Sequence, residues 1–282
     1  MTTTPPKLTD RAMLARNRDR TSEQALFLHE IAADQIEDRL QMVKRSFRDV
    51  AIVTGQPVFW SRRFPDATIV ADESVLDLTE SGYDLVIHAM ALHWADDPVG
   101  QLVQARRALR PDGLFLSVAF GGQTLAELRA ALADAEARVM GGLSPRVAPM
   151  LEIRDAGGLL QRAGLTLPVA DTEKLTVSYG DLLALMRELR AMGESNALAA
   201  RDRRIPPSAL FAEAARLYAE RFPDADDPTR IRATFELVHL SGWAPDDSQP
   251  KPLRPGSATT RLSDALGTVE HRTRDNPRGS VD

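Results

Sequence analysis

The chain has 282 residues, of which 43% are hydrophobic and 27% are charged, proportions typical of a globular protein with a sizeable core. Its formal net charge of -5 argues against a protein that binds nucleic acid or an anionic membrane. Because the chain has no cysteine, disulfides, thiolate metal sites and thiol catalysis are excluded, and a reducing compartment is favoured.

Targeting signals are not evident in the sequence. No apolar run is long enough for a transmembrane helix, and residues 1–7 lack the apolar core of a signal peptide. Residues 11–20 are rich in arginine, but Asp10 and Asp19 interrupt the basic stretch, which is unlike a cleaved transit peptide. We therefore expect a cytoplasmic protein without an integral membrane segment, and a flexible N-terminal arm over residues 1–20.

The first half of the chain alternates between predicted helices and strands. A helix is predicted over residues 23–44, because Thr21 and Gln24 form a capping-box pair ahead of apolar residues at helical spacing. Another is predicted over residues 97–109, with Pro98 in its first turn. Short apolar runs predict four strands, at Val50–Thr54, Thr68–Ala71, Asp84–Ala89 and Leu114–Ala119.

The second half adds helices and two strands. Helices are predicted from Phe120 to about Met140 and over residues 152–163, 182–191 and 210–221, and strands over residues 175–178 and 235–240. Residues 21–245 are therefore expected to form one domain, followed by a Pro-rich, flexible tail over residues 246–282. Strands that alternate with helices predict a doubly wound, mostly parallel α/β sheet, in which ligands bind beyond the carboxyl ends of the strands.

Two segments are distinctive. Gly82–Trp94 is predicted to contain a strand followed by a polar loop. Arg107–Phe115 is predicted to contain a helix end, a Pro-Asp-Gly turn and the start of a strand. In order and spacing they resemble motifs IV and V of the class I S-adenosylmethionine (SAM) methyltransferases. More narrowly, the chain from about Asp10 to Leu266 resembles the methyltransferase-like family of the mitochondrial complex I assembly factor 5, which is similar to the malonyl-carrier-protein methyltransferases of biotin synthesis. The segments that carry this resemblance are residues 120–129, 142–145, 192–196 and 241–243.

The resemblance implies a Rossmann-like fold with a helical N-terminal arm and helical lid insertions. It also implies a SAM-dependent methyltransferase-like protein that acts on a protein substrate, such as a respiratory-complex subunit, in complex I assembly. The alternative is a non-catalytic assembly factor or binding module that has lost SAM binding. A hydroxylase, the activity associated with the complex I branch, requires an iron site; the sequence has no His-x-Asp or His-x-Glu pair, and we expect no metal.

The segment expected to bind SAM is short and poor in glycine. Residues 54–57 read Thr-Gly-Gln-Pro, with one glycine, no acidic residue at the strand end, and a proline that has no N–H to offer a ligand. About 30 residues separate Val50 from Asp84, which leaves room for one strand and one short helix. Thr54 and Gly55 remain candidates for cofactor contact. Asp72 and Glu73 are candidates for a ribose or adenine contact, or else for a solvated helix cap.

Other candidate residues follow the third and fourth strands. Trp94 is expected to stack on a ligand, and His93 to contact the cofactor and to act as the catalytic residue through hydrogen bonding or proton transfer. The alternative is a half-buried loop aromatic beside a satisfied histidine. The residues expected to line a substrate pocket are Gly121, Gly122, Thr124, Glu194 and Asn196. Glu194 and Asn196 suit a guanidinium or carboxyl group, although a strand-to-helix turn and a helix stop would explain the same five residues.

Overall fold

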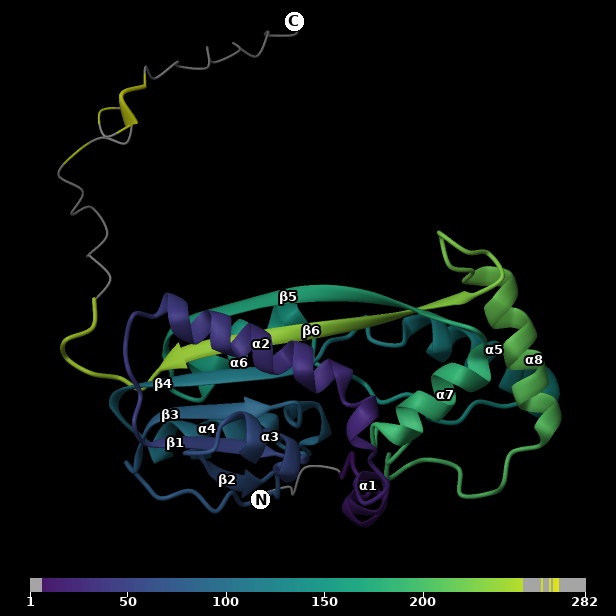
Figure 1. Cartoon of the computed structure of the whole chain (residues 1–282), viewed down its shortest axis with the longest axis horizontal. Helices are drawn as coiled ribbons and strands as arrows, with labels where there is room; N and C mark the ends of the chain where they lie inside the picture. The colour runs from purple at the N-terminus through teal and green to yellow at the C-terminus, as the bar shows by residue number, and fades with distance from the viewer. Residues whose placement is uncertain (1–6, 251–259, 261–263, 265, 269–282) are drawn as a thin grey trace, which may run out of the picture. The chain divides into compact units, whose positions relative to one another are not determined.

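The computed structural model describes residues 7–250, 260, 264 and 266–268 of the chain drawn in Figure 1. The chain divides into a unit of residues 1–247, which contains the sheet, and a unit of residues 248–282. The flexible tail predicted over residues 246–282 lies mostly outside the described residues, so it stays a prediction. None of the helices in the described part of the chain combines the length and apolarity needed to span a bilayer.

The described residues form six strands: β1 Val50–Thr54, β2 Thr68–Ala71, β3 Tyr83–Ala89, β4 Leu109–Phe120, β5 Thr166–Tyr179 and β6 Ile231–Trp243. They make one sheet in the order β2-β1-β3-β4-β6-β5 (Figure 1). Strands β1 to β4 run parallel, and β6 is antiparallel to both β4 and β5. The predicted doubly wound, mostly parallel α/β class is therefore confirmed.

The described residues also form eight α-helices: α1 Arg11–Arg18, α2 Phe27–Met42, α3 Pro57–Arg63, α4 Pro98–Ala108, α5 Ala126–Met140, α6 Ile153–Arg162, α7 Leu182–Ala191 and α8 Ser208–Arg221. Local chemistry sets several of their starts. Pro57 and Pro98 occupy first turns, where a missing N–H costs nothing. The side chains of Asp97 and Asp181 accept hydrogen bonds from the N–H groups of the first turns of α4 and α7.

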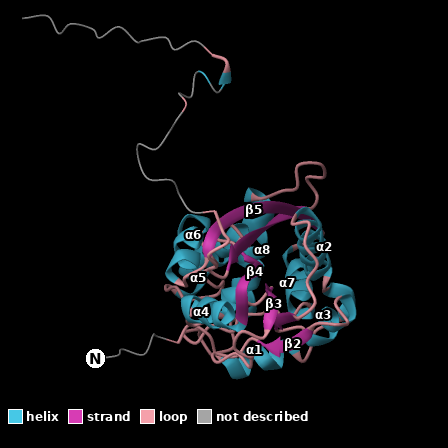
Figure 2. Cartoon of the chain, turned by 90° about the vertical axis from the view of Figure 1, so that its left-hand side faces the viewer, coloured by secondary structure: helices cyan, strands magenta, loops and turns pink. Residues whose placement is uncertain are grey.

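Helices cover both faces of the sheet (Figure 2). On one face Ile52 and Ile87 belong to a large core cluster with residues of α2 and with Trp60 of α3. On the other face Ala51 and Val86 pack with residues of α4 and α6. Neighbouring strand residues thus alternate between two apolar cores, which explains why β1 and β3 are almost continuously apolar in sequence.

The hairpin of β5 and β6 extends past the end of β4. Residues 237–243 of β6 pair with β4, whereas residues 231–236 pair only with β5. The helices α7 and α8, which are inserted between β5 and β6 in sequence, lie with α5 beside this extension (Figure 1). This is the helical insertion that the resemblance implied. Both strands are far longer than predicted, because β5 is an edge strand whose alternate residues are exposed and partly polar.

The N-terminal segment differs from the flexible arm expected over residues 1–20. Residues 11–18 form α1, whose N-terminus is capped by the Asp10 carboxylate at 3.1 Å from the Met13 nitrogen. Leu14 is buried, and the Asn17 amide donates to the Ser195 carbonyl at 2.9 Å. These contacts join residues distant in sequence, so local patterning could not reveal that the segment is docked.

Candidate functional site

The carboxyl ends of the parallel strands, together with α1 and residues 192–196, enclose most of the candidate residues. Asp72 follows β2. Because Thr54 of β1 pairs with Ala71 of β2, the end of β2 lies beside Gly55. His93 and Trp94 lie in a short 3-10 turn after β3. Since this is the edge of an α/β sheet where ligands usually bind, its polar contacts decide what the site can hold.

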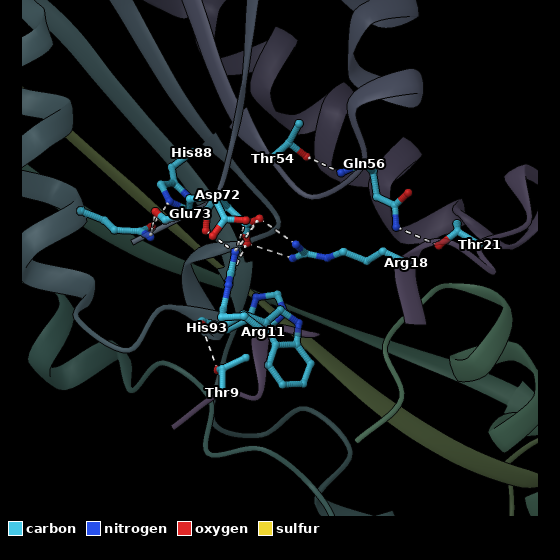
Figure 3. A network of polar contacts seen from close by, with 12 residues as sticks. Thr9, Arg11, Arg18, Thr21, Thr54, Gln56, Asp72, Glu73, His88 and His93 are labelled. Carbon is cyan, nitrogen blue, oxygen red and sulfur yellow. Dashed lines mark hydrogen bonds and ion pairs between the residues drawn. The ribbon is translucent and has the colours of Figure 1, made fainter. Parts of the chain in front are cut away.

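The Asp72 carboxylate is clamped by two arginines of α1 (Figure 3). Arg18 donates from Nη1 to Oδ1 at 2.7 Å and from Nη2 to Oδ2 at 3.0 Å, a bidentate pair. Arg11 donates from Nη2 to Oδ1 at 3.2 Å and to the Asp72 carbonyl at 2.6 Å. Burial alone would raise the pKa of Asp72, but the two guanidinium groups hold that pKa below its ordinary value. Asp72 is therefore an anion neutralised by the protein's own cations.

The loop after β1 is closed by the same helix. A Cβ atom on Gly55 would lie 2.0 Å from Cζ of Arg18, so the guanidinium fills the space above this glycine. The Gln56 N–H donates to Thr54 Oγ1 at 3.1 Å, and the Gln56 amide donates to Thr21 Oγ1 at 3.0 Å. In this arrangement the Asp72 carboxylate is already paired and Arg18 covers Gly55, so cofactor contact by Thr54, Gly55 and Asp72 stays a prediction. Glu73 lies outside the clamp, with an exposed side chain 3.8 Å from Arg11.

Residues 192–196 hold α1 from the other side. Gly193 has a φ of +82°, and a Cβ atom there would lie 2.7 Å from Thr21 Oγ1 and 3.2 Å from Cα of Arg18. Both the backbone conformation and the close approach require glycine at this position. The glycine in this segment thus has a packing role against the N-terminal segment, in addition to ending α7.

Glu194 lies at the centre of the second group of candidate residues. Its Oε2 accepts a hydrogen bond from Trp94 Nε1 at 2.9 Å and lies 3.4 Å from His93 Nε2. Burial alone would raise the pKa of Glu194, but His93, Arg18 and Trp94 together hold it below its ordinary value. Glu194 is therefore a buried carboxylate in its ionised form, and both of its hydrogen bonds to described residues reach Oε2. The His93 ring is buried, and its centroid lies 4.8 Å from that of the Phe120 ring. The Nδ1 atom of His93 has no hydrogen-bond partner among the described residues.

An apolar pocket of about 240 Å³ opens beside Glu194. It lies among the loop after β3, α5, α7, α8 and the β5–β6 extension. Arg146 and Asn196 are polar members of its wall. Its main apolar walls are Trp94, Phe120, Leu128, Met186, Phe211 and Phe235. A carboxylate in the wall of a mostly apolar pocket suits a side chain with an aliphatic stem and a cationic head.

The other predicted pocket residues are placed differently. Thr124 contributes to the wall, but its Oγ1 exchanges hydrogen bonds with the backbone of Glu236 at 3.1 and 3.0 Å. Asn196 also lines the wall, while its amide donates to the Pro145 carbonyl at 2.9 Å. Gly121 and Gly122 are not among the lining residues, and a Cβ on Gly121 would lie 2.6 Å from the Glu236 carboxylate. These two glycines allow close packing at the end of β4.

Sequence patterns missed the residues that close the site, Arg11 and Arg18. Their spacing of two helical turns, which puts them on one face of a helix, is the signal that could have identified them as a pair. Arg146 was also missed. Its guanidinium pairs with the Glu136 carboxylate at 2.7 Å, and Glu136 lies in the preceding helix, α5. Among the described residues, no group of three or more His, Cys, Asp or Glu side chains is placed to hold a metal ion, and the metal-free expectation stays a prediction.

The chain is similar in sequence to known proteins. Residues 12–117 match the family model described as Methyltransferase domain. The chain is 37% identical over 200 residues to the "Arginine-hydroxylase NDUFAF5, mitochondrial" of Danio rerio, an alignment that covers 71% of this chain and 61% of that protein. It is 35% identical over 181 residues to the "Malonyl-[acyl-carrier protein] O-methyltransferase" of Xylella fastidiosa (strain M23), covering 64% and 58%. The chain thus spans less than two thirds of either relative.

Among solved structures, the YcgJ protein from Bacillus subtilis aligns with a TM-score of 0.45 and 9% identity over 72% of this chain and 94% of that one.

Proposed function

Since the chain is related to the methyltransferase domain family through residues 12–117, we propose that it is a methyltransferase-fold module that recognises a basic side chain of a partner protein. It does so without SAM while α1 is docked. The observation that supports a function without SAM is the clamp of Arg11 and Arg18 on Asp72 above Gly55. A ribose would need that carboxylate, and a cofactor would need the space that Arg18 fills.

The pocket beside Glu194 supports recognition of a basic side chain. An arginine entering it would place its aliphatic stem against Phe211 and Phe235 and its guanidinium near the Glu194 carboxylate and the Trp94 ring. We propose that the partner is a protein of respiratory complex I assembly, because the chain resembles the complex I assembly factor family and is similar to an arginine-hydroxylase of Danio rerio. The expected cytoplasmic location stays a prediction. The Danio rerio relative, by contrast, is described as mitochondrial.

Arginine recognition predicts a charge-dependent binding event. N-acetylarginine methylamide should bind the full chain in calorimetry at least about tenfold more tightly than its neutral isostere N-acetylcitrulline methylamide, because a charge-assisted hydrogen bond contributes about 1.5–3 kcal/mol. Glu194→Gln should remove this preference. Glu220→Gln, which changes a carboxylate that is 63% exposed, is the matched control and should retain it. Equal binding of the two probes to the unmodified chain would contradict the proposal.

A second candidate function, a SAM-dependent methyltransferase that acts on a protein, is favoured by one observation. A cleft of about 750 Å³ lies at the carboxyl ends of β1 and β2, within the size range of small-molecule sites, and Gly55, Phe59 and Ile69 form part of its wall. This function requires that α1 leave Asp72. His93 would then be the residue to test for proton transfer, because it is buried and its Nδ1 has no partner within the described part of the chain.

A further inference from the structure

We propose that Arg146 determines specificity in the pocket beside Glu194, by donating a hydrogen bond to a main-chain carbonyl of the polypeptide whose basic side chain enters that pocket. This inference rests on the proposed function, because it concerns the ligand that the same pocket would take. It adds that the ligand is a residue within a polypeptide, recognised through its main chain as well as through its charged side chain.

Arg146 has hydrogen-bond donors that the protein itself does not use. It lines the pocket, and the hydrogen bonds among the described residues use only its Nη2, which donates to Oε1 of Glu136 at 2.7 Å. Its Nε is buried and has no acceptor in the described part of the chain. A guanidinium is a donor at all three nitrogens, and a buried donor without an acceptor is unfavourable. A bound molecule that offers an oxygen acceptor would therefore improve this arrangement.

The charge of Arg146 is already matched inside the protein. The Glu136 carboxylate is 3% exposed, and it also accepts hydrogen bonds from Ser144, at 3.0 Å from the backbone nitrogen and 2.6 Å from Oγ. Burial alone would raise the pKa of Glu136, but hydrogen bonds from Arg146 and Ser144 hold that pKa below its ordinary value, so Glu136 is an anion. A ligand carboxylate on the same guanidinium would lie close to this anion and be repelled, whereas a neutral carbonyl would not.

The segment that contains Arg146 is fixed to the segment that contains Glu194. The Asn196 amide donates to the Pro145 carbonyl at 2.9 Å, which joins the residue before Arg146 to a residue two positions after Glu194. Among the described residues no ion pair connects Arg146 with Glu194, although both line the pocket. A cation and an anion thus hold set positions in one apolar pocket, and each can contact a different part of one ligand.

The size of the pocket and the depth of its charged residues indicate how a ligand would lie. The volume of about 240 Å³ is below the about 300–1,000 Å³ of ordinary small-molecule sites, which suits one inserted side chain. Glu194 is 9% exposed and contacts the buried His93 ring, whereas Arg146 is 15% exposed. Hydrogen bonds from Arg204 and the charge of Arg146 lower the pKa of Asp202 to about 2, so Arg146 lies toward the loop before α8. We expect the basic group to reach Glu194 and the main-chain carbonyl to lie beside Arg146.

The test is a calorimetric titration of the full chain with three guanidinium compounds. N-acetylarginine methylamide has main-chain carbonyls, butylguanidine has the side chain alone, and N-acetylarginine has a carboxylate in place of one amide. The pocket variant is Arg146→Met with Glu136→Gln, which removes both charges of the pair and leaves no buried carboxylate alone. Arg138→Met with Glu213→Gln, which removes a pair between α5 and α8 whose arginine is 51% exposed, is the matched control.

In the unmodified protein and the control, we expect N-acetylarginine methylamide to bind at least about tenfold more tightly than butylguanidine, the effect of one charge-assisted hydrogen bond. In the pocket variant this ratio should fall below about threefold, because the affinity for the methylamide falls and that for butylguanidine does not. N-acetylarginine should bind no more tightly than the methylamide. If the pocket variant fails to fold, Arg146→Lys, which keeps a cation beside Glu136 and removes the guanidinium donors, is measured in its place and must meet the same criterion.

Equal binding of N-acetylarginine methylamide and butylguanidine to the unmodified protein, or an unchanged ratio in the pocket variant, overturns the role of Arg146. Binding of N-acetylarginine about tenfold more tightly than the methylamide also overturns it, and indicates a carboxylate ligand instead. Failure of the proposed function gives a different result, in which the arginine probe binds no more tightly than its citrulline isostere. A retained preference for arginine over citrulline, with butylguanidine bound equally well, overturns only the role of Arg146.

Discussion

Replacing Trp60 with alanine should lower the free energy of unfolding by about 3–5 kcal/mol, the usual cost of removing a large aromatic side chain from a core. Trp60 is fully buried in α3, stacks on Phe64 and meets Phe59 edge to face. Its Nε1 donates to His29 Nδ1 at 3.1 Å, and burial lowers the pKa of His29 to about 4, which keeps that nitrogen available as an acceptor. The substitution would leave both a cavity and a buried histidine without its donor.

Urea denaturation at neutral pH measures this effect. Trp60→Phe is the matched control, because it retains most of the apolar volume and removes only the hydrogen bond; its expected cost is about 1–2 kcal/mol. A loss smaller than about 1 kcal/mol for Trp60→Ala would contradict the packing described for α3. Because α3 begins at Pro57, the same anchor also fixes the loop that contains Gly55.

Replacing Asp72 with asparagine should lower the free energy of unfolding by about 2 kcal/mol at neutral pH, because two guanidinium groups lose their anion. The cost falls below that of breaking a fully buried ion pair, about 3–5 kcal/mol, because Arg11 is 30% exposed and water can solvate its guanidinium. Urea denaturation is again the measurement. Asp171→Asn, in a pair with Arg39 where the carboxylate is 48% exposed, is the control and should cost at most about 1 kcal/mol.

The same carboxylate predicts a pH dependence. The folded-state pKa of Asp72 is held below its ordinary value of 3.8, so its stabilising contribution is complete above that value and is lost as the pH falls toward the folded pKa. The stability difference between the unmodified protein and Asp72→Asn should therefore narrow below about pH 4. A difference that stays constant down to pH 3 would show that Asp72 is not held as an anion by the two arginines.

The short strands β1 and β2 could be predicted from the sequence, and the long hairpin of β5 and β6 could not. β1 and β2 agree with the predicted bounds, because each is a compact apolar run with both ends marked by polar residues. β5 and β6 were predicted as fragments, since their length depends on pairing with each other across the inserted helices α7 and α8. The alternation along β5 is interrupted at residues 171–174, which are all exposed, so no continuous pattern marks the whole strand.

Like the fold, the candidate site could be predicted from the sequence only in part. Glu194, His93 and Trp94 were each identified from their position after a strand or helix, and the structure brings their side chains into contact. Arg18 was assigned to a flexible arm, because nothing near it in sequence indicates that Asp72 is its partner. The shortened segment after β1 indicated that cofactor binding had changed, but not that an arginine fills the space above its single remaining glycine.

The most direct test of the account is a calorimetric titration of the unmodified full chain with SAM. Far-UV circular dichroism on the same sample would establish that the protein is folded. Because Arg18 pairs with Asp72 above Gly55, we expect no saturable heat, corresponding to a Kd weaker than about 1 mM. Saturable binding with a Kd in the micromolar range, abolished by Asp72→Asn, would contradict the closed cofactor site and favour the SAM-dependent methyltransferase.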